Sequence, residues 1–385
     1  MAILRLVVRN ARRHALRSLL TVVGLVVAVL AFGLLQTVVR AWYAGADAAS
    51  ATTLVTRNAT SLIFPMPLSY AAKMRAVPGV TGVAWANWFG GVYQEPKNFF
   101  PQLAISGASY LDMYPDFIID DAARRDFLRD RQGAVIGRKL AAAYGFRVGD
   151  VIPLRGTIYP GEWRFVVRAI YDGRQASTDT AQMLFHWDYL NETLRARSPR
   201  RAHQVGIYVV KVGRAEDSAA VGAAIDATFR NSRAETLTET EKAFQLSFVA
   251  MSGTIVSAIR LVSFVVILII MAVMANTMAM SARERLAEYA TLKALGFGPW
   301  FLARLIFGES LLLALAGGAL GVALLYPAAA AFGAALGTLF PVFEVAPATV
   351  AQQLAAALAV GVVAAAAPTW RAARIGIVDG LRNVG

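Results

Sequence analysis

Uncharged hydrophobic stretches occur near the N-terminus and again through the C-terminal third of the chain. Four of them contain no Asp, Glu, Lys or Arg, at residues 18–39, 261–282, 310–343 and 345–370. A helix needs roughly 20 apolar residues to cross the hydrocarbon of a bilayer. The pattern therefore predicts four transmembrane helices, at 18–40, 255–281, 299–332 and 348–369.

Two of these stretches allow a second interpretation. The third is longer than one span needs and contains Pro327, so we interpret its end as a short extracytoplasmic loop at 333–347. The first could be a cleaved signal peptide, because residues 44–46 (Ala-Gly-Ala) fit a small-residue cleavage site. A signal sequence has an apolar core of about 7–15 residues, and Leu19–Val39 is longer, which favours a retained anchor.

The segment at 41–250 mixes two periodicities. Short β-rich apolar runs ended by Gly or Pro predict strands at 81–91, 101–109, 149–156, 162–172 and 204–212. Helical patterns occur at 68–77, 137–145 and 215–230. We therefore expect a large α+β domain between the first and second spans. The polar residues 231–245 lead into the second span and predict a helical stalk.

Arginine placement sets the expected orientation. Residues 1–17 carry five arginines and no acidic residue, and residues 370–385 carry three arginines and one aspartate. Basic residues beside spans mark the cytoplasmic side. We therefore expect a cytoplasmic amphipathic helix at 1–17, a cytoplasmic tail at 370–385 and an extracytoplasmic 41–250 domain.

Composition narrows the class of protein. Charged residues make up 16% of the chain, against about 25% in typical soluble domains, as expected for a protein that lies in a lipid bilayer. The net charge of +13 could indicate a nucleic-acid partner, but residues 40–260 mix 26 basic with 20 acidic residues. That mixed surface argues against nucleic-acid binding.

No pattern of catalytic or metal-binding residues is evident. None of the six lysines precedes Ser or Thr, so the phosphate-binding loop that ends in Gly-Lys-Ser/Thr is absent. There is no cysteine, and the three histidines (His14, His186, His203) have no zinc-site spacing. We expect no enzymatic activity, no metal and no cofactor in this chain. The span cores also lack the ionisable residues of an ion or proton path.

Residues 282–298 form a charged segment between the second and third predicted spans. On a helix, its bulky residues gather on one half and its small residues on the other. A helix resting on a membrane would instead show one apolar and one strongly polar face, so this one is suited to packing between two surfaces. Gly296 stands where a helix C-cap is expected. A plain amphipathic connector is the alternative.

Small residues recur at a spacing of four in and after the third predicted span. The pairs are Gly317 with Gly321 and Gly333 with Gly337. Such spacing allows transmembrane helices to approach closely. The alternative is that small residues are simply common in membrane helices.

Several motifs follow one another along the chain. They are VVRNARRHALRSLLTVVGLVVAV (7–29), VPGVTGVA (77–84), AVIGRKLAAAYGFRVGDVIPLRG (134–156), RERLAEYATLKALGFG (283–298), ESLLLALAGGALG (309–321) and PTWRAARIGIVDGLR (368–382). In this order they resemble the permease subunits of MacB/FtsX/LolC-type ABC transporters, the mechanotransmission class. The resemblance covers almost the whole chain.

The resemblance implies a MacB-like periplasmic core domain, a dimer with a second copy or a paralogue, and a separate ABC ATPase subunit that binds the ATP. Residues 283–296 are then the coupling helix that docks into that ATPase. Its expected polar contacts are Arg283, Glu284, Arg285, Glu288 and Lys293. Its expected packing residues are Leu286, Tyr289, Leu292 and Leu295, with Gly296 at its end.

The function that the resemblance implies is ATP-driven work at the outer face of the bacterial inner membrane. Export of an amphipathic compound, a peptide or a lipid-linked substrate is the leading hypothesis, with a periplasmic adaptor and an outer-membrane duct as further partners. The alternative is an FtsX-like regulator or a signalling protein that activates a periplasmic partner, such as a cell-wall hydrolase, and transports nothing.

Overall fold

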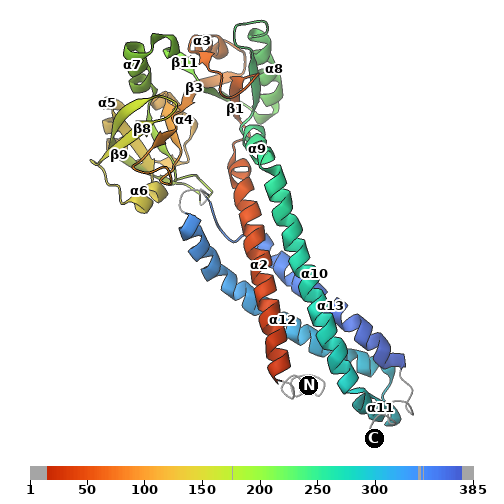
Figure 1. The fold of residues 1–385 in the computed structure, drawn as a ribbon. Coiled ribbons are helices and arrows are strands. Elements are labelled where there is room, and N and C mark those ends of the chain that lie inside the picture. The colour runs from red at the N-terminus through yellow and green to blue at the C-terminus, as the bar shows by residue number, and fades with distance from the viewer. Residues whose placement is uncertain (1–14, 176, 337–339, 341, 375–385) are drawn as a thin grey trace. The chain divides into compact units, whose positions relative to one another are not determined.

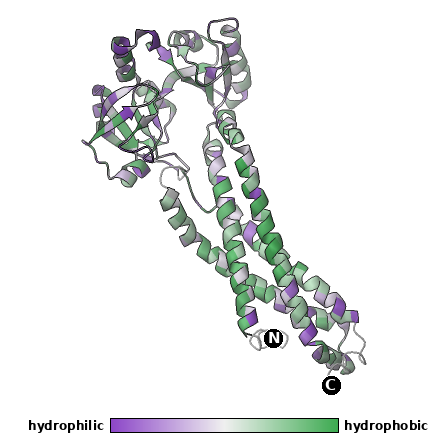
Figure 2. Ribbon diagram, in the orientation of Figure 1, coloured by the Kyte–Doolittle hydropathy of each residue, from purple (hydrophilic) through white to green (hydrophobic). Residues whose placement is uncertain are grey.

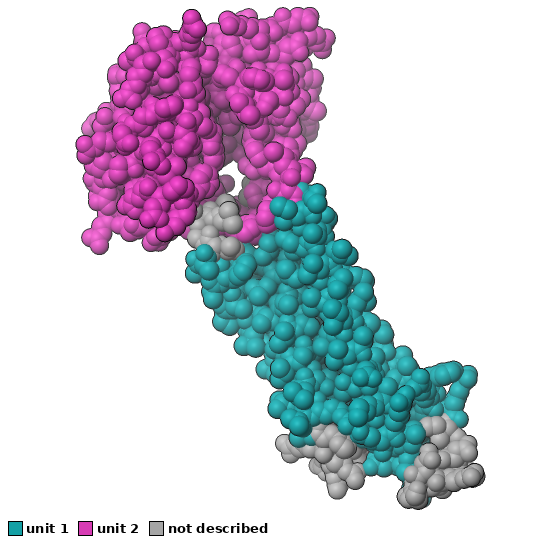
Figure 3. Space-filling view, viewed as in Figure 1, with its two compact units in different colours: residues 1–40, 253–335, 343–385 teal, residues 41–252, 336–342 magenta. Residues whose placement is uncertain are grey.

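The computed structural model describes residues 15–175, 177–336, 340 and 342–374. The chain divides into two compact units, coloured separately in Figure 3. The first consists of Met1–Arg40, Gly253–Ala335 and Phe343–Gly385, and the second of Ala41–Ser252 and Leu336–Val342. Most of the expected helix at 1–17, most of the tail at 370–385 and Gly337 lie outside the described residues.

The first unit is made of helices. They are α2 (Ala15–Ala48, whose last turns belong to the second unit), α10 (Gly253–Glu284), α11 (Leu286–Ala294), α12 (Pro299–Leu336) and α13 (Pro347–Arg374). All except α11 are long and apolar enough to cross a membrane, and Figure 2 shows hydrophobic residues along them. The four predicted spans therefore correspond to α2, α10, α12 and α13, with α12 continuing through Pro327 beyond the expected end at 332.

The helices of the first unit approach closely where one of them carries a glycine. A Cβ added at Gly317 would lie 2.8 Å from Leu25 Cδ2, and one at Gly321 would lie 2.9 Å from Val29 Cβ. The buried amide of Gln353 donates a 2.7 Å hydrogen bond to the Val29 carbonyl. Both α12 and α13 therefore pack directly on α2.

The second unit is built on a mixed sheet. Its eleven strands follow the order β13-β1-β12-β3-β5-β10-β7-β9-β8-β4, and β6 pairs with β9 outside this path. Their bounds are β1 Thr53–Asn58, β3 Val80–Trp88, β4 Gly91–Val92, β5 Gln102–Ile105, β6 Phe117–Ile118, β7 Gly133–Gly137, β8 Val151–Gly156, β9 Gly161–Gly173, β10 Met183–His186, β12 Ile207–Val212 and β13 Thr236–Thr240. A separate ribbon joins β2 (Met66–Pro67) to β11 (Gln204–Val205).

Helices flank this sheet (Figure 1). They are α3 Tyr70–Arg75, α4 Ala108–Met113, α5 Asp121–Arg129, α6 Arg138–Tyr144, α7 Trp187–Arg197, α8 Ser218–Thr228 and α9 Glu241–Met251, with 3-10 turns η1 Pro199–Arg201 and η2 Ala215–Asp217. Successive residues of the central strands enter two different cores, because side chains alternate across a strand. Leu184, for example, belongs to one core and Phe185 to the other.

The predicted helical stalk at 231–245 is wrong in its first part. Residues Thr236–Thr240 form β13, which pairs antiparallel with β1 from Asn58↔Thr236 to Leu54↔Thr240. A helix begins only at Glu241. The alternation of threonine with other residues at 236–240 suits a pleated edge strand. β1 pairs with β12 along one edge only, and its other edge offers backbone hydrogen bonds to this strand. The predicted strand at 101–109 is also shorter, because α4 starts at Ala108.

Candidate functional site

The charged segment between α10 and α12 is a short helix with a defined beginning and end. α10 stops at Glu284, Arg285 leaves helical geometry with φ −105° and ψ 14°, and α11 follows. At the other end, Gly296 has φ +92°. Its N–H donates to the Lys293 carbonyl and the next N–H, of Phe297, donates to the Leu292 carbonyl. This is a Schellman ending, which needs a left-handed residue and therefore favours glycine.

A buried ion pair fixes the start of this segment to α12. Nη1 of Arg285 lies 2.6 Å from Oε2 of Glu309, and the two side chains are 4% and 7% exposed. Glu309 lies well inside α12, which is a candidate span. Taking two charges out of water is costly, and removing one partner of such a pair typically costs about 3–5 kcal/mol. The pair therefore holds Arg285 and Glu309 in one arrangement.

Tyr289 lies directly against this ion pair. It is buried, and burial raises the pKa of its hydroxyl to about 12. The adjacent Ser310 donates a 2.6 Å hydrogen bond to the Gly361 carbonyl of α13. The start of α11 is thus connected through α12 to α13.

Two further contacts attach the segment to other helices. Arg17, near the start of α2, makes a bidentate pair with Glu284 at 2.7 Å. Both side chains are about one-third exposed, so this pair contributes only about 0–1 kcal/mol. Lys293 donates a 2.9 Å hydrogen bond to the Ala373 carbonyl near the end of α13. The stretch from Glu284, the last residue of α10, to the end of α11 therefore contacts α2, α12 and α13.

The exposed residues at the C-terminal end of the segment include three large apolar side chains. Leu295 is 70% exposed, Phe297 42% and Trp300 69%. These three residues, which we call the apolar turn, lie at the end of α11, in the turn and at the start of α12. Leu286 and Leu292 are only partly exposed and pack against the core of the first unit. Arg283 at the end of α10 and Glu288 on α11 are also exposed.

Two family models match the chain. The description "MacB-like periplasmic core domain" matches residues 18–228, which is more than half of the chain, and "FtsX-like permease C-terminal" matches residues 260–377. The chain belongs to the MacB/FtsX-type family of ABC transporter permeases. The second match includes the candidate site from α10 to α13. This assignment confirms the family and the fold that the sequence motifs predicted, and the permease is a multi-pass membrane protein with an α+β domain between its first and second spans.

Solved structures show weaker similarity to the permease. One is the extracellular domain of the noncanonic ABC-type transporter YknZ from Gram-positive bacteria, with 13% identity, TM-score 0.34, and coverage of 49% of this chain and all of that one. Another is the periplasmic region of MacB from Actinobacillus actinomycetemcomitans, with 10% identity, TM-score 0.36, and coverage of 52% and 94%.

A third similar structure is a domain of a putative permease from Porphyromonas gingivalis, with 16% identity, TM-score 0.35, and coverage of 50% and 92%. No curated protein matches the permease.

The predicted coupling residues differ in what they contact: some contact or pack against the same chain, and others are exposed. Glu284, Arg285 and Lys293 contact other parts of the same chain. Tyr289, Leu286 and Leu292 pack inward, whereas Leu295 and Gly296 are exposed. A Cβ added at Gly333 would lie 3.2 Å from Cδ1 of Phe343, and Gly317 and Gly321 lie against α2.

Sequence reasoning missed Glu309, Arg17, Phe297 and Trp300 as parts of this site. Glu309 carried the clearest signal. It is an acid at the edge of an uncharged stretch of 34 residues. Placing an acidic side chain inside a membrane is energetically unfavourable, so such residues are rare and indicate a specific role. Within the described residues, no group of three His, Cys, Asp or Glu could hold a metal ion.

Proposed function

We propose that this permease converts ATP hydrolysis by a separate ABC ATPase subunit into motion of its extracytoplasmic domain. The observation that carries the proposal is the stretch from Glu284 to Trp300, which contacts α2, α12 and α13 through Glu284, Arg285 and Lys293 and exposes the apolar turn. A partner that grips this turn would displace α2, α12 and α13 together. No P-loop occurs in this sequence, so the ATP is bound by the partner.

The apolar turn is the proposed contact with the ATPase. Protein interfaces gain most of their energy from a few large side chains in a desolvated centre, with aromatic residues enriched. Trp300 and Phe297 are of this type, and Leu295 extends the patch. In this proposal Arg285 and Glu309 position the turn, while the exposed Arg283 and Glu288 are further candidate contacts with the ATPase.

Work at the outer face, rather than passage through the helices, is the proposed use of the motion. Glu309 lies deep within α12, one of the four candidate spans, and its charge is paired with that of Arg285. That arrangement provides no polar path for a solute. We therefore propose export of an amphipathic compound, a peptide or a lipid-linked substrate, together with a second permease copy or paralogue, a periplasmic adaptor and an outer-membrane duct.

Co-purification of the ATPase from detergent tests the proposal. Leu295→Glu and Trp300→Glu should each reduce retention of the ATPase subunit, because hot-spot truncations typically cost about 2 kcal/mol or more. Ile63→Glu is the matched control, since Ile63 is 87% exposed but lies in the second unit. Equal retention by all three variants, or no ATPase with the unmodified chain, would overturn the proposal.

A further inference from the structure

The second unit has two helical connections that enter it at the same edge of the sheet. α2 ends at Ala48 and reaches β1 after four residues, and β13 passes into α9 with no residue between them. The hydroxyl of Thr240, the last residue of β13, accepts a hydrogen bond from the N–H of Ala243 and caps α9. A movement of α9 therefore acts directly on β13.

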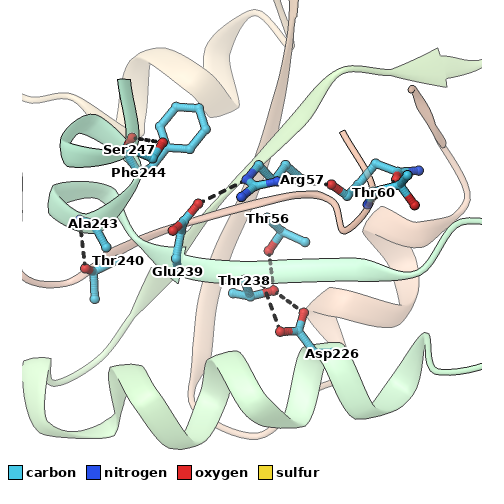
Figure 4. A network of polar contacts seen from close by, with 11 residues as sticks. Thr56, Arg57, Thr60, Asp226, Thr238, Glu239, Thr240, Ala243, Phe244 and Ser247 are labelled. Carbon is cyan, nitrogen blue, oxygen red and sulfur yellow. Dashed lines mark hydrogen bonds and ion pairs between the residues drawn. The ribbon is translucent and has the colours of Figure 1, made fainter. Parts of the chain in front are cut away.

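We call the junction of β13 and α9, at Thr240 and Glu241, the root of α9. Polar contacts hold β13 to its neighbours near this root (Figure 4). Thr238 bonds Thr56 across the strands at 2.9 Å, and Arg57 pairs with Glu239 at 3.1 Å. On the other side, Asp226 of α8 accepts hydrogen bonds from the hydroxyl and N–H of Thr238 at 2.7 and 3.0 Å. The root of α9 is thus fixed to β1 and α8.

Glu241, the first residue of α9, joins this root to two more segments. It is 9% exposed. Its Oε2 accepts a 3.1 Å hydrogen bond from the N–H of Ser50, just after α2, and its Oε1 accepts a 3.0 Å hydrogen bond from the hydroxyl of Tyr114, just after α4. Within the described residues the carboxylate has no ion-pair partner. One side chain therefore connects α9, the end of α2 and the end of α4.

From Tyr114, ring contacts continue to the far part of the sheet. The centroid of Tyr114 lies 5.4 Å from that of Phe117, which lies 4.7 Å from that of Tyr171 in β9. Tyr171 is fully buried and donates a 2.7 Å hydrogen bond to the Asp179 carbonyl. These rings connect the root of α9 with a strand that lies several positions away in the sheet order.

Burial of the Glu241 carboxyl is unfavourable, because it removes an ionisable group from water. Burial raises the pKa of the Glu241 carboxyl above its ordinary value, while the bonds from Ser50 and Tyr114 and the charge of Lys211 act in the opposite direction. The charged or titratable groups that face it are Lys211 on β12 and Tyr110 and Tyr114 at α4. An apolar residue of similar size would avoid the cost of desolvation but would make neither hydrogen bond.

We propose that Glu241 is a positioning residue that locks the root of α9 to the end of α2 and to Tyr114, so that a displacement of α9 reaches the β9 side of the domain. The inference rests on the proposed function only for what displaces α9. The lock itself is a property of the second unit and can be measured without any ATPase.

Spin labels can measure the lock because the chain contains no cysteine. Cysteines introduced at Ala250 on α9 and Arg125 on α5, both exposed, give one intramolecular distance within the second unit. In the full chain in detergent, we expect a narrow distance distribution. Glu241→Ala should broaden it by removing both bonds, and Tyr114→Phe should broaden it less because the ring stays.

Glu241→Gln is the conservative rescue. Its amide oxygen can accept from Ser50, and its NH2 group can donate to the Tyr114 hydroxyl, so the distribution should stay narrow. Glu241→Leu fills a similar space but accepts neither bond, so its distribution should be as broad as that of Glu241→Ala, whereas a role in packing alone would keep it narrow.

Unchanged distributions in both Glu241→Ala and Tyr114→Phe would overturn the inference, as would a glutamine variant as broad as the alanine variant. Co-purification of the ATPase with the same variants separates this result from the proposed function. We expect Glu241→Ala to retain the ATPase as well as the wild type does, because Glu241 belongs to the second unit and the apolar turn to the first. Loss of the lock with the ATPase retained supports the inference alone.

Discussion

The guanidinium of Arg285 and the carboxylate of Glu309 form a 2.6 Å ion pair that is almost completely buried. Arg285 stands at the break between α10 and α11, and Glu309 lies within α12. The pair therefore determines how a short helix outside the candidate spans is attached to one of them. Each partner depends on the other for the compensation of its charge.

Neutralising one member of this pair should destabilise the protein strongly. Arg285→Met or Glu309→Leu leaves an uncompensated buried charge, at a cost of about 3–5 kcal/mol. Arg285→Met combined with Glu309→Leu should recover most of that loss. Thermal unfolding in detergent measures the difference, with Arg17→Met at the exposed pair as the control. Equal small effects in all four variants would contradict a buried pair.

Stability should depend on pH through Glu241. Its folded-state pKa is raised by burial, so its stabilising contribution is fully present below the unfolded pKa and is lost as pH rises through the folded pKa. Glu241→Gln should therefore unfold at a higher temperature than the wild type at neutral pH, and the difference should shrink on acidification. Melting curves across this range test the sign. A difference that grows on acidification would show that the acid is stabilised as a carboxylate.

Enlarging the glycines of α12 should push it away from α2. A Cβ at Gly317 would lie 2.8 Å from Leu25, and overpacking of this kind costs about 1–3 kcal/mol. Gly317→Val should thus lower the melting temperature, and Leu25→Ala should partly restore it. Gly253→Val is a suitable comparison because nothing lies within 4 Å of a Cβ there. Similar losses at both positions would point to helix propensity instead of packing.

Accessibility to labelling should differ between the second unit and the turn after α11. A cysteine at Glu192 on α7, which is exposed, should react with a membrane-impermeant maleimide added to intact cells from which the outer membrane has been removed. A cysteine at Leu295 should react only after the membrane is permeabilised. The absence of native cysteine makes each label unique. Labelling in the reverse pattern would invert the expected orientation.

The spans and the α+β class of the domain were predictable because each depends on local patterns. A stretch such as 261–282 is apolar around the whole helix, and α8 and β12 follow the periodicities that predicted them. The strand at 236–240 was not predictable in the same way. Its threonines suit a strand, but the run is short and polar and leads directly into a helical pattern, and the partner strand β1, far away in sequence, provides the pairing that defines it.

The candidate site shows the same limit. Its position and its glycine ending were predictable, since the helix signals lie within 282–298. The partners of its charges were not predictable, because Arg285 bonds a residue 24 positions away, Lys293 one 80 positions away and Glu284 one 267 positions away. A charge on a helix surface looks the same in the sequence whether it faces another subunit or its own chain.

The direct passage from β13 into α9 has a consequence for helical phase. β13 ends at Thr240 and α9 begins at the next residue, Glu241, with no linker. The pairing of β13 with β1 therefore fixes the direction in which each α9 side chain points. Inserting one residue at that junction would rotate every later side chain of α9 by about 100°, since a helix has 3.6 residues per turn. The sheet therefore sets the rotation of α9 about its own axis. An insertion or deletion at this junction keeps the α9 side chains on their original faces only if it adds or removes close to a whole number of helical turns.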